Sequence, residues 1–367
     1  MKKNLRNILT LALGFVTVIA TAQSWDADSR TRVDMGGDND RFQTEQRMSL
    51  GASWGGDGWG INASGTANYA LDGTGSEVDF DFSEVSATTD LMGWATVTVG
   101  RQAMNYGSGL MVGSNDWGAN PYTRDGGTFA IDNDMVDLDF VYYRNNDGTP
   151  EEDNRDHYLI NAAKSDGDWS MNALFYSDSE DQDAMGLDFG YAMMGGDIDL
   201  SVSYNSASVN DIATGEAVDM DMTSFGATYN VSDNISISAS QTTYGDNGFA
   251  FIGSNYGLGV ASWGTHGNMG YLMPNDEDLA FGVNYASGDF TLGVNVHSVT
   301  NEEYMHANGD DYDRSVTEVS LNYNMSDNAN VGIKYATDEG SWASDVDGNS
   351  VAAAETKYMW LTLNITP

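Results

Sequence analysis

The feature that most constrains this chain is an alternation of apolar and small polar residues, which is clearest over residues 219–244. Phe225 and Tyr229 belong to an apolar set whose members are separated by glycine, threonine and asparagine. The alternation resumes after a polar turn at residues 231–234. Because successive side chains of a strand point to opposite faces of a sheet, this segment predicts a β-hairpin with one apolar and one polar face.

The turn of this hairpin recurs later in the chain. Residues 229–234 read YNVSDN and residues 323–328 read YNMSDN, and an alternating segment follows each of them. Serine, aspartate and asparagine favour turns because their short side chains hydrogen-bond to the nearby backbone. The repeat predicts that the chain uses one type of hairpin more than once.

Similar alternating segments cover most of the chain, and most have about the ten residues that a tilted strand needs to cross a bilayer. The expected strands span residues 25–35, 41–54, 58–69, 78–88, 94–103, 123–131, 135–145, 155–165, 168–178, 184–193, 197–208, 219–230, 233–244, 277–287, 289–300, 313–324, 328–338 and 355–365.

The connections between these segments alternate in length. Short links, such as residues 55–57 and 231–234, are followed by mostly longer ones. The longer connections span residues 104–122, 146–154, 208–218, 245–276, 301–312 and 339–354. Short turns on one rim and long loops on the other are typical of outer-membrane barrels. The sequence therefore predicts an all-β fold, a transmembrane antiparallel β-barrel of about 18 strands, or alternatively about 16, with short periplasmic turns and long extracellular loops.

The two faces of the expected strands differ in polarity as the two sides of such a barrel do. In strand 197–208, Ile198 and Leu200 alternate with Asp199 and Ser201. In a membrane barrel the apolar face contacts lipid and the polar face contacts water. Side chains cannot fill the lumen of a barrel of this size, so we expect an aqueous interior that loops make narrower.

The first residues predict export from the cytoplasm. A basic start precedes an apolar run over residues 8–20 and the small residues Ala20-Thr21-Ala22. This order is typical of a secretory signal peptide, so we expect residues 1–22 to be removed and residues 23–367 to form a single barrel domain. The chain contains no cysteine, which excludes disulfides and a lipid anchor on cysteine.

The charge of the chain limits its partners. Its formal net charge is −40, from 55 acidic and 15 basic residues. A field of this sign repels polyanions, so nucleic acid is not an expected partner. The expected partners are outer-membrane lipid, small hydrophilic solutes and cations, and a homotrimer is expected by analogy with other porins.

The polar faces supply the candidate pore-lining residues. The basic candidates, inward or at the rim, are Arg47, Arg101, Arg124, Arg155 and Lys334, and the acidic ones are Asp79, Asp81, Asp137, Asp139, Asp188, Asp199 and Asp221. Strict alternation from Val97 points Arg101 outward, and only a bulge near Gly100 turns it inward. Acids that line a narrow aqueous channel favour cations, although the same aspartates also suit ordinary solvated wall positions.

One stretch of the chain resembles a known family. Between Val97 and Phe129 the matching residues are Gly100-Arg101-Gln102, Tyr106-Gly107, Gly113, Trp117, Arg124-Asp125-Gly126 and Thr128-Phe129. This stretch resembles the alginate-export-like family of outer-membrane porins, and the resemblance implies a large single-chain barrel of 18 strands. Members that conduct alginate line their pores with basic residues. The many aspartates here disfavour transport of that polyanion, because like charges repel at close range.

The sequence gives no sign of catalysis. The histidines, His157, His266, His297 and His306, have no spacing that pairs them with a serine nucleophile or with each other as metal ligands. We therefore expect no enzymatic activity, no cofactor and no metal site.

These patterns favour an outer-membrane porin of a Gram-negative bacterium through which small hydrophilic solutes and ions diffuse passively, with a preference for cations. Two alternatives stay open. One is a channel selective for a substrate such as a sugar or oligosaccharide. The other is a structural or adhesion barrel, closed inside, whose acidic loops act outside the cell.

Overall fold

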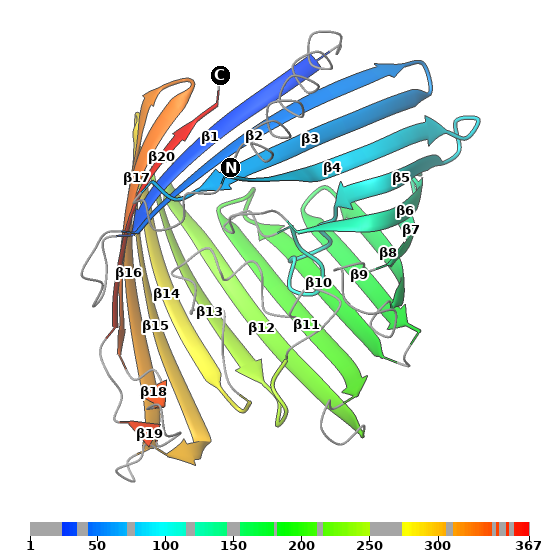
Figure 1. The fold of residues 1–367 in the computed structure, drawn as a ribbon. Helices are drawn as coiled ribbons and strands as arrows, with labels where there is room; N and C mark the ends of the chain where they lie inside the picture. Colours follow the sequence, from blue (N-terminus) through cyan, green and yellow to red (C-terminus); the bar gives the residue numbers. More distant parts are fainter. Residues whose placement is uncertain are drawn as a thin grey trace.

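Eighteen strands form one antiparallel sheet that closes into a barrel in the computed structural model (Figure 1). The structure describes residues 24–34, 43–71, 78–114, 122–144, 155–179, 182–210, 216–249, 274–305, 311–339, 343–344, 350–351 and 356–366. The expected signal peptide lies outside the described residues, as does most of the long connection at 245–276.

The barrel strands follow the order of the chain around the ring. They are β1 (Ser24–Asp34), β2 (Gln43–Gly56), β3 (Trp59–Tyr69), β4 (Asp79–Asp90), β5 (Thr96–Ala103), β6 (Thr123–Ile131), β7 (Asp137–Arg144), β8 (Asp156–Asp166), β9 (Trp169–Asp178), β10 (Asp183–Met193), β11 (Ile198–Asn210), β12 (Ala217–Ser232), β13 (Ile235–Tyr244), β14 (Glu277–Ser287), β15 (Phe290–Met305), β16 (Asp311–Ser326), β17 (Ala329–Glu339) and β20 (Thr356–Ile365). Strand β20 pairs with both β17 and β1, where Ser29 lies opposite Ile365, and this pairing closes the ring.

The structure confirms the expected barrel of 18 strands. Its strands match the expected segments, with β12, β15 and β16 each 16 residues long. A separate two-stranded hairpin, β18 (Ala343–Ser344) and β19 (Ser350–Val351), lies within the last long connection. We call the edge that carries the short connections the turn rim and the opposite edge the loop rim.

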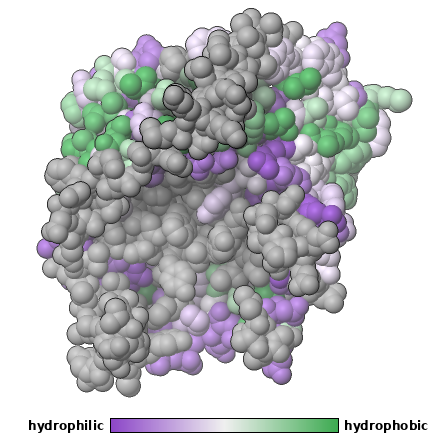
Figure 2. All heavy atoms as spheres, in the orientation of Figure 1, coloured by the Kyte–Doolittle hydropathy of each residue, from purple (hydrophilic) through white to green (hydrophobic). Residues whose placement is uncertain are grey.

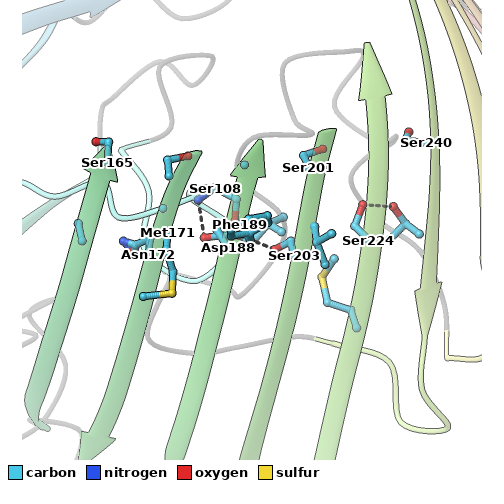
Figure 3. Close-up of a pocket in the computed structure, with 18 of the residues that line it drawn as sticks. Ser108, Ser165, Met171, Asn172, Asp188, Phe189, Ser201, Ser203, Ser224 and Ser240 are labelled. Atoms are coloured by element: carbon cyan, nitrogen blue, oxygen red, sulfur yellow. Dashed lines mark hydrogen bonds between the residues drawn. The ribbon is translucent and has the colours of Figure 1, made fainter. Parts of the chain in front are cut away.

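The outer face of the barrel is apolar. Trp59, Phe225 and Phe281 are about half exposed on this face although they are large and hydrophobic. Figure 2 shows hydrophobic residues over the outside of the upper strands and hydrophilic ones around the central hollow. Residues of the opposite parity, such as Ser201 and Ser224, point inward (Figure 3). The alternation in the sequence therefore corresponds to the two faces of the barrel wall.

The repeated SDN turn has the same geometry at both of its positions. The register of the hairpin shifts by one residue between Asn230 and Ser232, and again between Asn324 and Ser326. In each turn the serine Oγ accepts a hydrogen bond of 3.3 Å from the backbone N–H of the asparagine, which is Asn234 or Asn328. A β-bulge of this kind increases the local twist of the strands.

The asparagine of each SDN turn also contacts the neighbouring part of the turn rim. The side chain of Asn234 donates to the backbone carbonyl of Ala286 at the end of β14. The side chain of Asn328 donates to the carbonyl of Thr366 over 2.8 Å, directly after β20. The backbone carbonyl of Asn234 accepts a hydrogen bond from the N–H of Ala286, and the backbone carbonyl of Asn328 accepts one from the N–H of Thr366. The repeated motif therefore connects adjacent hairpins.

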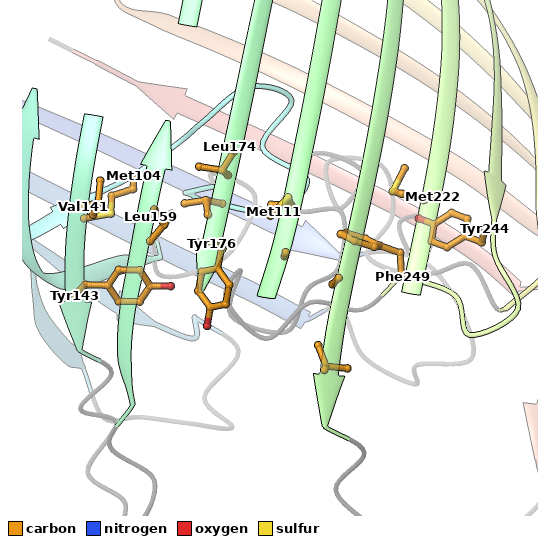
Figure 4. Packing of buried hydrophobic residues seen from close by; sticks show 14 residues of the cluster. Met104, Met111, Val141, Tyr143, Leu159, Leu174, Tyr176, Met222, Tyr244 and Phe249 are labelled. Carbon is orange, nitrogen blue, oxygen red and sulfur yellow. The ribbon is translucent and has the colours of Figure 1, made fainter. Parts of the chain in front are cut away.

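An apolar cluster lies inside the barrel, next to the wall formed by β7 to β13 (Figure 4). The segment 104–114, which follows β5, turns into the ring of strands (Figure 1), and we call it the inner loop. Met104, Met111 and Val112 of the inner loop are at most 4% exposed. They pack with inward side chains of the wall, which include Val141, Leu159, Leu174 and Met222. The inner face is therefore apolar at the place where the inner loop covers it, in contrast to the polar inner face that the alternation predicts.

Candidate functional site

A cavity of about 660 Å³ lies inside the barrel beside the inner loop. Hydroxyl groups from five strands line its wall (Figure 3). They belong to Ser165 of β8, Ser170 of β9, Ser201 and Ser203 of β11, Ser224 of β12, and Ser240 and Thr242 of β13. We call this cavity the hydroxyl chamber. The serines line it because they occupy the inward positions of strands whose outward positions are apolar.

Three aspartates and a histidine add ionisable side chains to the hydroxyl chamber, which Lys164 also lines. Asp137, Asp188 and Asp278 line it together with His297. His297 Nδ1 lies 2.9 Å from Asp278 Oδ2, so these two side chains are paired with each other. The chamber can therefore offer both hydrogen-bond donors and acceptors to a polar solute.

The inner loop forms one side of the hydroxyl chamber through Gly107, Ser108 and Leu110. Asp188 contacts this loop directly, because its Oδ2 accepts a hydrogen bond of 2.9 Å from the backbone N–H of Ser108 (Figure 3). Its other oxygen, Oδ1, accepts a bond of 2.5 Å from Ser203 Oγ on the next strand.

A second aspartate of the wall also holds the inner loop. Tyr106 is hydrogen-bonded to the side chains of Asp139 and Thr128. Burial of the phenol and the nearby Asp139 carboxylate raise the pKa of Tyr106 far above its usual value. The phenol therefore stays protonated and donates to Asp139.

An arginine cluster lies on the inner wall halfway around the ring from β10. Arg30 and Arg32 project inward from β1, and Arg47 lies directly opposite Arg30 on β2. Arg30 and Arg32 are 5% and 8% exposed. Glu45 contacts Arg30 over 2.8 Å, and Asp28 lies 3.5 Å from Arg47. We call these three arginines the arginine wall.

Sequence reasoning found Arg47 and missed the two arginines of β1. The segment 25–35 was expected to be a strand, and Arg30 and Arg32 lie in it at alternate positions after Asp26 and Asp28. That spacing puts all four on one face of a strand. The signal was thus present, although only the closure between β1 and β20 shows that this face lies inside.

Lys334 and Arg314 are further basic side chains of the inner face, and both are paired with acids. Lys334 of β17 lies 3.3 Å from Glu318. Arg314 of β16 contacts Asp338 with two bonds of 2.9 and 2.8 Å. Arg124, a predicted site residue, is 2% exposed and lies with its guanidinium 5.5 Å from the centre of the Tyr143 ring.

The structure places most of the predicted site residues on the inner face, but on different parts of the wall. The inward ones are Arg47, Asp79, Asp81, Arg124, Asp137, Asp139, Asp188, Asp199 and Lys334. Asp137 and Asp188 meet at the hydroxyl chamber, whereas Asp79 and Asp81 lie on β4. A role of these side chains in binding or selecting solutes stays a prediction.

Two predicted site residues face outward instead. Arg101 lies opposite Val85 and Asp125 on the outer face, where it forms a two-bond ion pair with Asp125 at 2.7 Å. Gly100 has a positive φ of 128°, but the register continues through it without a shift. Alternation therefore holds, and the inward position of Arg101 that a bulge would have produced is not found.

The structure also places Asp221 outward, so its prediction as a pore-lining residue is wrong. It lies opposite Ser206 and shares the outer face of β12 with Phe225, whereas Met220 and Met222 point inward. The inner positions at this end of the strand are apolar because they pack in the cluster beside the inner loop. The polarity of the two faces is thus reversed near the loop rim, and polarity alone assigns Asp221 to the wrong side.

Within the described parts of the chain, no group of three or more histidine, aspartate or glutamate side chains is arranged to hold a metal ion. No described helix is long and apolar enough to cross a membrane.

The fold is similar to that of several solved structures. Pseudomonas aeruginosa OccK1 (OpdK) matches with a TM-score of 0.71 and 12% sequence identity over 94% of this chain and 99% of that one. Pseudomonas aeruginosa OccK2 (OpdF), in complex with glucuronate, matches with a TM-score of 0.70 and 13% identity over 94% and 99% of the two chains. OpdK has also been solved with vanillate. No protein-family model and no curated protein match the sequence.

Proposed function

We propose that this protein is a channel of the bacterial outer membrane, selective for small organic solutes that carry a carboxylate and hydroxyl groups. The observation that carries the proposal is the pair of unlike surfaces inside the barrel. The arginine wall, Arg30, Arg32 and Arg47, lies halfway around the ring from Asp188 of the hydroxyl chamber.

The outer face supports a location in the outer membrane. Closed barrels can cross a bilayer because pairing between strands satisfies every backbone hydrogen bond. The apolar outer face would contact lipid, the turn rim would face the periplasm and the loop rim would face the outside. The likeness in fold is to outer-membrane channels, which gives the same location. A channel works by binding and diffusion, so the proposed function is not enzymatic.

The chemistry of the two surfaces suits a solute with two kinds of polar group. Arginine recognises a carboxylate with two parallel hydrogen bonds, and such charge-assisted bonds are the stronger ones. Serine and threonine hydroxyls both donate and accept, so the hydroxyl chamber can exchange hydrogen bonds with hydroxyl groups of a solute. Vanillate and glucuronate, which are bound in the matched structures, both carry a carboxylate and at least one hydroxyl group.

Substrate selectivity is therefore favoured over general diffusion, which was the first interpretation of the sequence. Asp139 and Asp188 also have a structural role, because they accept hydrogen bonds from the inner loop. Glu318 and Asp338 are likewise paired with basic side chains. The remaining inward acids, which include Asp79, Asp81, Asp137 and Asp199, support a cation preference as the second candidate.

Current through a planar bilayer tests the proposal. We expect glucuronate to block the current of the wild-type channel in a saturable way. Arg47→Gln should weaken this block about tenfold or more, because a hydrogen bond to a charged group contributes about 1.5–3 kcal/mol. Arg144→Gln is the matched control, since Arg144 is exposed on the outer face and pairs there with Asp156.

Three other outcomes would contradict the proposal. Unsaturable passage of glucuronate would favour general diffusion, with the reversal potential in a salt gradient reporting the cation preference. Equal block of both variants would remove the arginine wall from the mechanism. A complete lack of current would favour the closed structural or adhesion barrel. The homotrimer stays a prediction, and the resemblance to the alginate-export-like family rests on its residue motif alone.

A further inference from the structure

We propose that Asp188 is the positioning residue that holds the tip of the inner loop, Gly107 and Ser108, inside the lumen and thereby sets the open cross-section of the pore. This inference rests on the proposed channel function. It assigns to Asp188 a role different from the wall charge that the sequence predicts.

Both oxygens of the Asp188 carboxylate take part in holding the tip. Oδ2 accepts the Ser108 backbone N–H over 2.9 Å, and Oδ1 accepts the Ser203 hydroxyl over 2.5 Å. Ser203 Oγ in turn accepts a bond of 3.1 Å from the side chain of Asn205, which is 2% exposed. The carboxylate is therefore fixed on the wall side by β11 while it binds the loop on the lumen side.

The glycine at the tip allows this close approach. Gly107 has a φ of 56°, in the left-handed region that glycine adopts without strain. A Cβ atom at this position would lie 2.0 Å from Asp188 Oδ2 and 3.2 Å from Asn172 Oδ1. The contact between the tip and Asp188 therefore requires a residue without a side chain.

The stem of the inner loop is held in a different way. Met104, Met111 and Val112 are buried in the apolar cluster. Gly186, two residues before Asp188 on β10, leaves room for Met111, whose Sδ would lie 2.8 Å from a Cβ there. Loss of Asp188 should thus free the tip while the stem stays in place, so the barrel should still fold.

Asp199 distinguishes a positioning role from a simple charge effect. It also projects inward, from β11, where it lies opposite Ala192 of β10 and Thr228 of β12. Its carboxylate accepts a bond of 3.4 Å from Asn230, at the turn rim. Removal of either aspartate takes one negative charge from the same wall, but only Asp188 contacts the tip in the described structure.

Single-channel recording of four variants tests the inference. Asp188→Ala should raise the conductance of the open channel, because the tip no longer stays in the lumen and narrows it. It should also raise the noise of the current, because a tip that moves makes the open cross-section fluctuate. Asp188→Asn should stay close to the wild type in noise, since its amide oxygen can still accept the Ser108 N–H. Asp199→Ala and Asp199→Asn should change only the ion preference. Equal changes in noise for Asp188→Ala and Asp199→Ala would overturn the proposal.

A measurement that does not depend on conduction tests the anchoring of the inner loop by Asp188 separately from the proposed channel function. In detergent-solubilised protein, hydrogen exchange at the Ser108 amide should become about tenfold faster or more in Asp188→Ala, a factor that corresponds to about 1.4 kcal/mol. Gly107→Ala should have the same effect. Gly288→Ala is its control, because Gly288 has a similar φ of 57° and open space around it. Unchanged exchange in Asp188→Ala would refute the anchor even if the channel conducts, and a wild type without current would refute only the channel.

Discussion

Two arginine–aspartate pairs of the barrel have nearly the same geometry but lie on opposite faces of the wall. Arg314 and Asp338 join β16 and β17 inside the barrel, with side chains 7% and 0% exposed. Arg101 and Asp125 join β5 and β6 outside, with side chains 41% and 44% exposed. When its arginine is removed, a buried carboxylate keeps a negative charge that nothing compensates, whereas water can solvate an exposed carboxylate. The face of the wall should therefore decide what each pair contributes to stability.

We predict that Arg314→Met lowers the free energy of unfolding by about 3–5 kcal/mol, the usual cost of removing one partner of a buried ion pair. Arg101→Met should lower it by at most about 1 kcal/mol, as is usual for exposed pairs. Urea unfolding in lipid vesicles, followed by tryptophan fluorescence, measures both. Similar costs for the two variants would contradict the burial argument.

At the scale of the element, the repeated SDN hairpin shows how a short motif can join neighbouring strands. Its serine caps the turn, and its asparagine connects the turn to the next part of the turn rim. In the second copy, Asn328 binds Thr366 through both its side chain and its backbone carbonyl. Strand β20, which closes the barrel, is therefore held at its end by a turn from another hairpin.

Asn328→Ala should lower the free energy of unfolding by about 1 kcal/mol, the typical net value of one hydrogen bond. It should also make hydrogen exchange faster near the end of β20, around Ile365. The control is Asp327→Ala, which changes the adjacent turn residue and leaves both Asn328 bonds in place. If the control accelerates exchange near Ile365 as much as Asn328→Ala does, the side-chain bond is not what holds the strand.

At the scale of the whole molecule, the barrel separates two environments across a wall one residue thick. Ser224 and Phe225 are consecutive in the middle of β12, yet Ser224 lines the hydroxyl chamber and Phe225 is 54% exposed on the outer face. An arginine should thus have very different effects at these two neighbouring positions.

Phe225→Arg should destabilise the protein in a bilayer by about 2–4 kcal/mol, the cost of a basic side chain on the lipid face near the midplane. Ser224→Arg should leave stability much less affected, because its guanidinium can reach water in the lumen, and it should reduce the conductance. Folding into lipid vesicles and single-channel recording measure these effects. Equal destabilisation by both substitutions would mean that the two faces do not differ as described.

The sequence by itself predicted about 18 strands, their approximate bounds and the face of most of the candidate pore-lining residues. Backbone pairing allows only a period of two, so one apolar side and one polar side can be read from local composition. Arg101 shows the strength of this rule, because its outward position follows from strict alternation despite the unusual φ of Gly100.

Only the tertiary structure decided where the inner loop lies and what it does to the wall. The side chains of segment 104–114 pack against residues of β7 to β13, which are distant in sequence, and local periodicity carries no information on such contacts. That packing makes the inner face apolar near Asp221 and turns Asp188 from a wall charge into a partner of the loop. Likewise, closure of β20 on β1 brings Arg30 and Arg32 to the lumen, because pairing between the two ends of a chain depends on the whole ring.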